Sequence, residues 1–166
     1  MDIRYTLDDG QVRGTLMRLM ALGQNPQPAL RDVAAIGESS TRLRFRTQTG
    51  PDGQRWKPSL RVLLSGGRTL TKDGHLSGSL SSGATNSYAQ WGVNRIYAAI
   101  QQFGGVIRAK TAAALKFFVP GGGFAVVKAV RMPARPYLGV NDDDSRDMLD
   151  AIERRIGNAQ GAAHAG

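Results

Sequence analysis

The residues of this sequence that could do chemistry are few and lie far apart. His75 has only Asp73 near it, and metal sites in proteins need several ligands at set spacings. His164 lies in a tail of small and polar residues. The acidic triplet over 142–144 is typical of the start of a helix, and we prefer this interpretation to a calcium site. The chain also has no cysteine. We therefore expect no catalytic site, no bound metal and no cofactor, and we expect that the protein is not an enzyme.

Charge is the stronger signal. The chain has 166 residues and a formal net charge of +9, and residues 59–140 carry ten Lys and Arg against the single Asp73. Such an excess predicts an acidic partner, which could be nucleic acid, an acidic protein surface or membrane headgroups. Residues 141–166 carry six acidic side chains against three basic ones. A basic middle beside an acidic end also allows copies of the chain to bind head to tail.

The basic run defines a second hypothesis, a nonspecific nucleic-acid-binding protein. The candidate contact residues for DNA or for a neighbouring subunit are Arg108, Lys110, Lys116, Lys128 and Arg131. The aromatic residues interleaved with them, among them Phe103, Phe117 and Phe118, are expected to face the core rather than to stack on bases. A DNA binder of this kind would bind random duplex with a steep dependence on salt.

The overall organisation predicted is one domain over 1–157, followed by a frayed tail over 158–166. No apolar stretch reaches the roughly 20 residues that a membrane span needs, and the N-terminus lacks the pattern of a secretory signal. We therefore expect a soluble intracellular protein that is neither inserted into a membrane nor exported.

Three helices are predicted from apolar spacing, over 9–22, 29–46 and 142–157. The first two are separated by a turn rich in proline and should pair as a helical hairpin. Arg42, Arg44 and Arg46 at the end of the second helix are interpreted as solvated side chains that complement its dipole. The rest of this segment has apolar residues along one stripe of the predicted helix.

The middle of the chain reads as strands with one short helix. We predict a strand over 88–93, a helix over 96–103, and a hairpin with strands over 114–120 and 124–130. Lys116 and Lys128 fall on the polar alternates of the hairpin and should share one wetted, basic face of a sheet. Residues 59–73 are expected to form a long mobile loop with one short element. The fold class is α+β, with the helical hairpin and the C-terminal helix packed on an antiparallel sheet.

Two further residues, Trp56 and Arg135, allow two interpretations each. Trp56, in a loop rich in Gly and Pro, is read as a cover over the edge of the core in preference to a partner contact. Arg135 lies between Pro133-Ala134 and Pro136. It is expected either to make an intersubunit or internal salt bridge or to be exposed to solvent.

Several motifs in one order resemble the virion morphogenesis or tail completion family of tailed bacteriophages, especially of Mu-like phages. They are Trp56-Lys57-Pro58, the Gly-x-Leu-x-x-Ser-Leu segment over 74–80, Tyr97-Ala-Ala-Ile-Gln-Gln-Phe-Gly-Gly over 97–105, and Pro-Ala-Arg-Pro-Tyr-Leu-Gly over 133–139. The chain departs from the family pattern with Gly74-His75 where Gly-Arg is usual, and with Gln101 or Gln102 where a histidine is usual. The motif residues that the resemblance marks as structural are Trp56, Gly74, Leu76, Ser79, Phe103, Gly104, Gly105, Pro133, Arg135 and Pro136.

The resemblance implies a structural protein that is not an enzyme and that completes or terminates the tail or joins it to the head. It would be made in the host cytoplasm and act in the virion neck as a homo-oligomeric ring, a hexamer, around the DNA channel. The expected partners are other copies of the chain, neighbouring neck, connector or tail-tube proteins, and packaged DNA by nonspecific contact. No membrane partner is expected.

Overall fold

The computed structural model describes residues 17, 20, 23–110, 112–119 and 122–158. The predicted helix over 9–22, and with it the predicted helical hairpin, falls almost wholly outside these residues, as does nearly all of the tail over 158–166. The helices are α2 (Gln27–Thr47), α3 (Leu60–Ser65), α4 (His75–Gly78), α5 (Ala98–Phe103) and α6 (Asp142–Asn158). The strands are β1 (Leu80–Ala84), β2 (Ala89–Val93), β3 (Gly105–Arg108), β4 (Leu115–Val119), β5 (Gly123–Val127) and β6 (Ala129–Met132).

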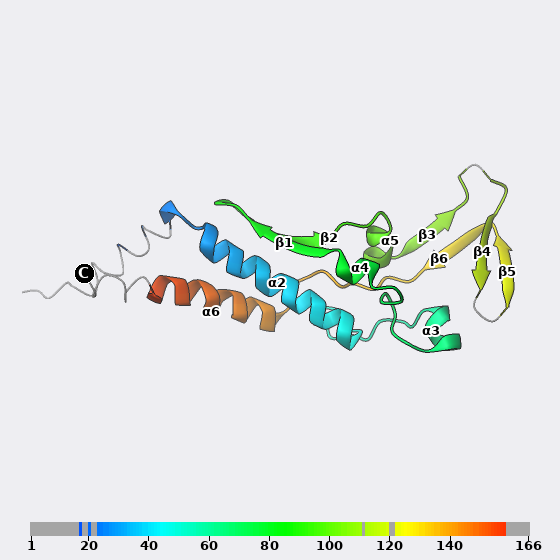
Figure 1. The fold of residues 1–166 in the computed structure, drawn as a ribbon, viewed down its shortest axis with the longest axis horizontal. Helices are drawn as coiled ribbons and strands as arrows, with labels where there is room; N and C mark the ends of the chain where they lie inside the picture. Colours follow the sequence, from blue (N-terminus) through cyan, green and yellow to red (C-terminus); the bar gives the residue numbers. More distant parts are fainter. Residues whose placement is uncertain (1–16, 18–19, 21–22, 111, 120–121, 159–166) are drawn as a thin grey trace, which may run out of the picture.

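The long helix α2 lies between α6 on one side and the β1–β2 hairpin on the other (Figure 1). Its N-cap is Pro26, where the fixed backbone angle of proline suits a helix start, and it ends at Gln48, which adopts a left-handed conformation with φ of 63°. Small buried side chains let neighbours approach closely. A Cβ added to Gly37 would fall 2.4 Å from Cε2 of Trp91, so the indole of β2 lies directly on the backbone of α2.

The C-terminal helix α6 begins at Asp142, and this confirms the predicted helix over 142–157 and its acidic start. Asn141 and Asp144 cap each other reciprocally. The amide of Asp144 donates to Oδ1 of Asn141 at 2.8 Å, and the amide of Asn141 donates to Oδ2 of Asp144 at 3.0 Å. At the far end, Nε of Arg155 donates to Oδ2 of Asp32 at 2.6 Å and ties α6 to α2.

The α+β class is confirmed, and the strands pair antiparallel, but they form three separate two-stranded sheets rather than one. The predicted strand over 88–93 is β2, the helix over 96–103 is α5, and α3 is the short element expected within 59–73. The predicted hairpin is β4–β5, with Lys116 opposite Val126. Its second strand is shorter than predicted, because the chain bends at Lys128 and continues as β6, which pairs with β3.

The buried centre of the fold lies at the C-terminal end of α2. Phe45, Trp56, Leu76 and Tyr137 form this cluster. The rings of Phe45 and Trp56 meet edge to face with centroids 5.6 Å apart, and those of Phe45 and Tyr137 lie 5.2 Å apart. These residues come from four distant places in the sequence, so they hold the loops and α4 against α2.

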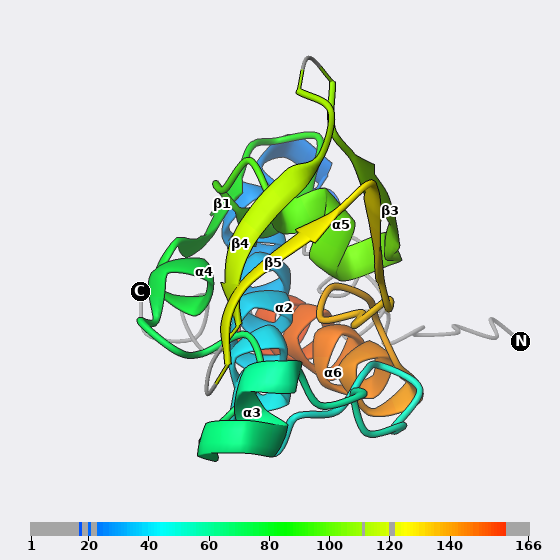
Figure 2. The same cartoon turned by 90° about the vertical axis from the view of Figure 1, so that its right-hand side faces the viewer.

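Strands β3 to β6 project away from this centre, and we call them the arm. The β3–β6 pair leads outward from α5, and the β4–β5 hairpin lies at its end (Figure 1). Seen from that end in Figure 2, the arm lies in front and α2 and α6 lie behind it. The molecule therefore has an arm at one end and a helical pair toward the other.

Candidate functional site

Trp56 belongs to the core, which confirms the interpretation as a cover over the core edge. Its side chain is buried, and Nε1 donates to the carbonyl of Pro136 at 2.8 Å. The backbone amide of Trp56 donates to the carbonyl of Gln48 at 2.8 Å, just beyond the end of α2. The Trp-x-Pro motif therefore joins the end of α2 to the Pro-Ala-Arg-Pro segment.

Arg135 is buried, with 3% of its surface exposed, so the solvent-exposed interpretation is wrong. Its Nε donates to the carbonyl of Lys57 at 2.8 Å, and Nη1 donates to Oε1 of Gln101 at 3.3 Å. No carboxylate pairs with it among the residues described, and burial lowers the pKa of its guanidinium. The predicted internal salt bridge is therefore wrong as well, and Arg135 instead joins the loop at Lys57 and helix α5 to its own segment through neutral acceptors.

Gln102 is a structural residue whose role the sequence did not reveal. Its Oε1 accepts from the amides of Tyr137 and Leu138 at 2.9 and 3.0 Å, and its Nε2 donates to the carbonyl of Leu138 at 3.0 Å. The amide side chain therefore pairs with the backbone of the 133–139 motif. The only signal for this role was the position of Gln102 inside the 97–105 motif.

The Phe-Gly-Gly motif fixes a sharp exit from α5. Gly104 has φ of 69°, and a Cβ there would fall 2.6 Å from the amide nitrogen of Ala134. At Gly105, with φ of 142°, a Cβ would fall 2.9 Å from Cδ1 of Ile100. Both positions favour glycine because other residues rarely adopt these angles, and at Gly104 the backbone of Ala134 also leaves no room for a Cβ. Phe103 itself is 78% exposed.

The remaining motif residues also have structural positions. Gly74 is the left-handed N-cap of α4, and Leu76 is buried in the core. Oγ of Ser79 donates to the carbonyl of Leu76 at 2.8 Å, which closes the turn into β1. Pro133 and Pro136 flank Arg135 in an extended, half-buried segment.

Arg44 is buried, so its interpretation as a solvated side chain is wrong. Its guanidinium binds Oδ2 of Asp144 and donates to the carbonyl of Gly139 at 2.7 Å. Ser40 donates to the other oxygen of the same carboxylate. The acidic start of α6 therefore neutralises a buried cation of α2. The sequence did not predict this ion pair, because its two residues lie far apart in the chain.

The five candidate basic residues, Arg108, Lys110, Lys116, Lys128 and Arg131, are all exposed and all belong to the arm and its connections. Nζ of Lys116 lies 4.8 Å from the centroid of the Phe124 ring. Lys128 lies at the bend between β5 and β6, so the prediction that it shares a sheet face with Lys116 is wrong. No acidic residue occurs between Gly74 and Asn141 to oppose these cations.

The prediction that the aromatic side chains of this region face the core is wrong for the arm. Phe118 and Phe124 are 64% and 67% exposed and meet edge to face with ring centroids 5.9 Å apart. Val126, on the same hairpin, is 63% exposed. The arm therefore presents cations and apolar side chains together.

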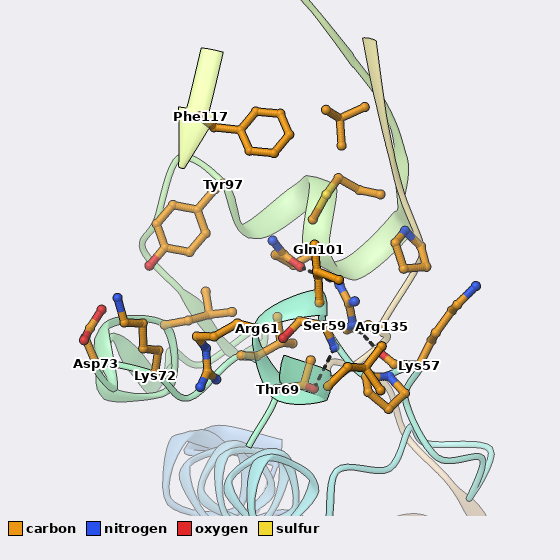
Figure 3. Close-up of a pocket in the computed structure, with 18 of the residues that line it drawn as sticks. Lys57, Ser59, Arg61, Thr69, Lys72, Asp73, Tyr97, Gln101, Phe117 and Arg135 are labelled. Carbon is orange, nitrogen blue, oxygen red and sulfur yellow. Dashed lines mark hydrogen bonds between the residues drawn. The ribbon is translucent and has the colours of Figure 1, made fainter. Parts of the chain in front are cut away.

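A cleft of about 730 Å³ separates the arm from α3. Figure 3 shows Gln101 and Arg135 near its centre, with Phe117 on the side of β4 and Thr69 on the opposite side. In the part of the chain that the structure describes, no group of three or more His, Cys, Asp or Glu side chains could hold a metal ion. No helix among these residues is long and apolar enough to cross a membrane.

An α+β chain whose motif residues form an interlocked scaffold, and whose cations lie on an exposed arm, has the features of an assembly protein. Residues 7–157 match the phage virion morphogenesis family, and the chain belongs to that family. This confirms the resemblance drawn from the motifs.

Two curated relatives have similar length. The chain is 31% identical over 138 residues to the putative capsid assembly protein G of Escherichia phage Mu, an alignment that covers 78% of each chain. It is 29% identical over 143 residues to the Mu-like prophage FluMu G protein 2 of Haemophilus influenzae, covering 86% of this chain and 87% of the relative. No solved structure matches the chain significantly.

Proposed function

We propose that this protein acts at the head–tail neck of a tailed phage as a tail completion, terminator or head–tail joining protein, in a homo-oligomeric ring around the DNA channel. A role in phage virion morphogenesis follows from the family. The observation that carries the finer proposal is the arm, which exposes both cations and large apolar side chains. Contiguous apolar surface of this kind is typical of a protein–protein contact.

The charge of the arm supports a place beside packaged DNA. Seven Lys and Arg and no acidic residue lie between Gly74 and Asn141, and the five of them on the arm and its connections are exposed. In a ring, cations that line the lumen attract the phosphate backbone without reading its sequence. A hexamer is the ring that we propose, with neighbouring neck, connector or tail-tube proteins above and below it.

The second candidate function is a nonspecific nucleic-acid-binding protein that acts outside the particle. Lys116 beside the exposed ring of Phe124 favours it, because a cation next to an aromatic face is a common feature of single-strand binding surfaces. Such a protein would bind random duplex or single strands with a steep salt dependence and would be absent from finished virions.

Electron microscopy of purified particles tests the proposal directly. A phage that carries a tagged copy of this protein is compared with one in which the gene is interrupted. We expect the tag at the junction of head and tail, and separate heads and tails when the gene is interrupted. The proposal fails if the protein is absent both from finished particles and from assembly intermediates that lack a neck.

A further inference from the structure

The arm is not completed by its own chain. Its β4–β5 hairpin has two strands of five residues each, and isolated hairpins of this size are at best marginally stable in water. Phe118, Phe124 and Val126 are each more than 60% exposed on it. In sheets of two strands, each strand also has an unpaired edge that can bind another chain. A partner would bury this apolar surface.

A groove with the complementary character lies between α2 and α6. It has a volume of about 330 Å³, and Ile36 and Leu43 of α2 line it together with Asp143 and Asp147 of α6. Leu43 is 49% exposed, so an apolar side chain is accessible in a lining that is otherwise mainly polar. Both acidic side chains are exposed. Among the residues that the structure describes, Asp143 pairs with Arg146 at the surface, and Asp147 forms no ion pair. The groove thus offers a small apolar area beside exposed negative charge, whereas the arm offers apolar side chains beside positive charge.

The two surfaces are well separated within one chain. The groove lies beside the C-terminal half of α2 and the start of α6, in the middle of the molecule, whereas the β4–β5 hairpin lies at the far end of the arm (Figure 1). Because the arm extends away from α2 and α6, it could reach the groove of its own chain only if the β3–β6 pair reversed its direction. A second copy can present its groove to the arm with no such change.

We infer that the arm of one copy docks in the α2–α6 groove of the next copy, with its cations opposite Asp143 and Asp147. This deepens the proposed function and rests on it. A contact between two different surfaces of one chain is heterologous, so repetition generates a ring when the rotation closes. Lengths agree, because five strand residues span about 17 Å, which matches roughly 11 residues of a helix such as α6.

A pair of charge-reversed variants tests this arrangement. Lys116→Glu with Lys128→Glu makes the β4–β5 hairpin and its exit acidic against an acidic groove, and Asp143→Lys with Asp147→Lys makes the groove basic against a basic hairpin. In sedimentation velocity each variant alone should self-associate about 100-fold more weakly than the unchanged chain, since like charges across an interface cost several kcal/mol. Mixed in equal amounts, they should assemble again, because every β4–β5 hairpin then meets a groove of opposite charge.

Three results would overturn the inference. They are an unchanged chain that is monomeric, single variants that assemble as well as the unchanged chain, and a mixture that stays monomeric although both variants are folded by circular dichroism. A basic groove variant that does not fold would be replaced by Asp147→Asn with Asp143→Asn, for which weaker assembly with no recovery on mixing is expected.

Cross-linking gives a test that does not depend on charge, because the chain has no natural cysteine. Val126→Cys on the arm with Leu43→Cys in the groove should give a ladder of covalent oligomers with a short bis-maleimide. Val126→Cys with Ser81→Cys, an exposed position on β1, is the matched control and should give none. Equal ladders from both pairs would contradict the docking.

The inference and the proposed function can fail separately. If the mixture stays monomeric but labelled particles carry the protein at the neck, the docking is wrong and the function stands. If the mixture assembles but the protein is absent from particles and intermediates, the neck function is wrong and the contact between copies stands.

Discussion

The scaffold around Tyr137 and the arm use the same kinds of residue in opposite ways. In the scaffold, Arg44 and Arg135 are buried, and their guanidinium N–H groups donate to backbone carbonyls, to a side-chain amide oxygen and to one carboxylate. On the arm, cations such as Lys116 and Lys128 are exposed and unopposed. Buried cations in this protein therefore specify the fold, whereas exposed ones are available to a partner.

Aromatic residues repeat this contrast. Phe45, Trp56 and Tyr137 fill the core, but Phe118 and Phe124 lie on the surface. The family motifs of this chain therefore maintain the scaffold, while the residues expected to contact other molecules lie between the motifs. The following changes should separate the two regions.

The largest loss is expected from Arg44→Met. It removes one partner of a buried ion pair and leaves the Asp144 carboxylate with an uncompensated charge, which typically costs about 3–5 kcal/mol. Urea unfolding would measure this loss. Arg42→Met is the control, because Arg42 is exposed and pairs with Glu38 on the helix surface, so its loss should be below about 1 kcal/mol. Equal losses of unfolding free energy in the two variants would contradict the distinction between buried and exposed arginines.

Gly104→Ala should come next, with a loss of about 2–3 kcal/mol from left-handed strain and from the contact with the backbone of Ala134. The matched control is Gly122→Ala on the arm, where a Cβ would meet nothing within 4 Å. That change should be nearly neutral. Thermal unfolding of both variants tests the pair, and a stable Gly104→Ala protein would show that the α5 exit is not held by the Pro-Ala-Arg-Pro segment.

Tyr137→Phe should cost about 1 kcal/mol at neutral pH, because the hydroxyl donates to the carbonyl of Ala98 at 3.1 Å. It should also alter the response to alkali. Burial, with a smaller contribution from Tyr97, raises the pKa of Tyr137 from 10.0 to about 12. The neutral phenol therefore stabilises the fold below pH 10, and this contribution is lost as the pH rises toward 12.

Melting temperatures measured from pH 9 to pH 12 check this prediction. The unchanged protein should lose more stability over that range than Tyr137→Phe, so the two curves should converge. Parallel curves would mean that the phenol ionises as readily in the folded chain as in the unfolded one.

The smallest effect on stability is expected from Phe118→Ser on the arm. The ring is largely exposed, so the free energy of unfolding should change by no more than about 0.5 kcal/mol. Self-association should nevertheless weaken in sedimentation velocity, because the apolar contact with the next copy is lost. A large loss of stability would place Phe118 in a core contact instead.

Local patterns in the sequence predicted most elements, because helix and strand periodicities depend on neighbours in the chain. The helix over 142–157, the β4–β5 hairpin and the burial of Trp56 were confirmed in this way. The change of partner at Lys128 was not predictable, because residues 124–130 form an apolar run interrupted only by Lys128, and such a run fits one continuous strand.

The candidate site was predicted less completely for a related reason. The sequence placed the cations together, but it assigned Arg44 to solvent because its partner Asp144 lies 100 residues away. It assigned Phe118 to the core because alternation in a strand identifies two faces without saying which one is covered. Both errors concern long-range packing, which neighbouring residues do not encode.

Amide hydrogen exchange, compared between the assembled chain and the Lys116→Glu, Lys128→Glu variant, would show whether the arm is stabilised only when copies of the chain assemble. Amides around Tyr137 and Gln102 should be strongly protected in both, because the scaffold is complete within one chain. Amides of β4 and β5 should exchange quickly in the variant and become protected, by about tenfold or more, in the assembled chain. An arm that is as protected as the scaffold in the variant, or unprotected after assembly, would contradict the account.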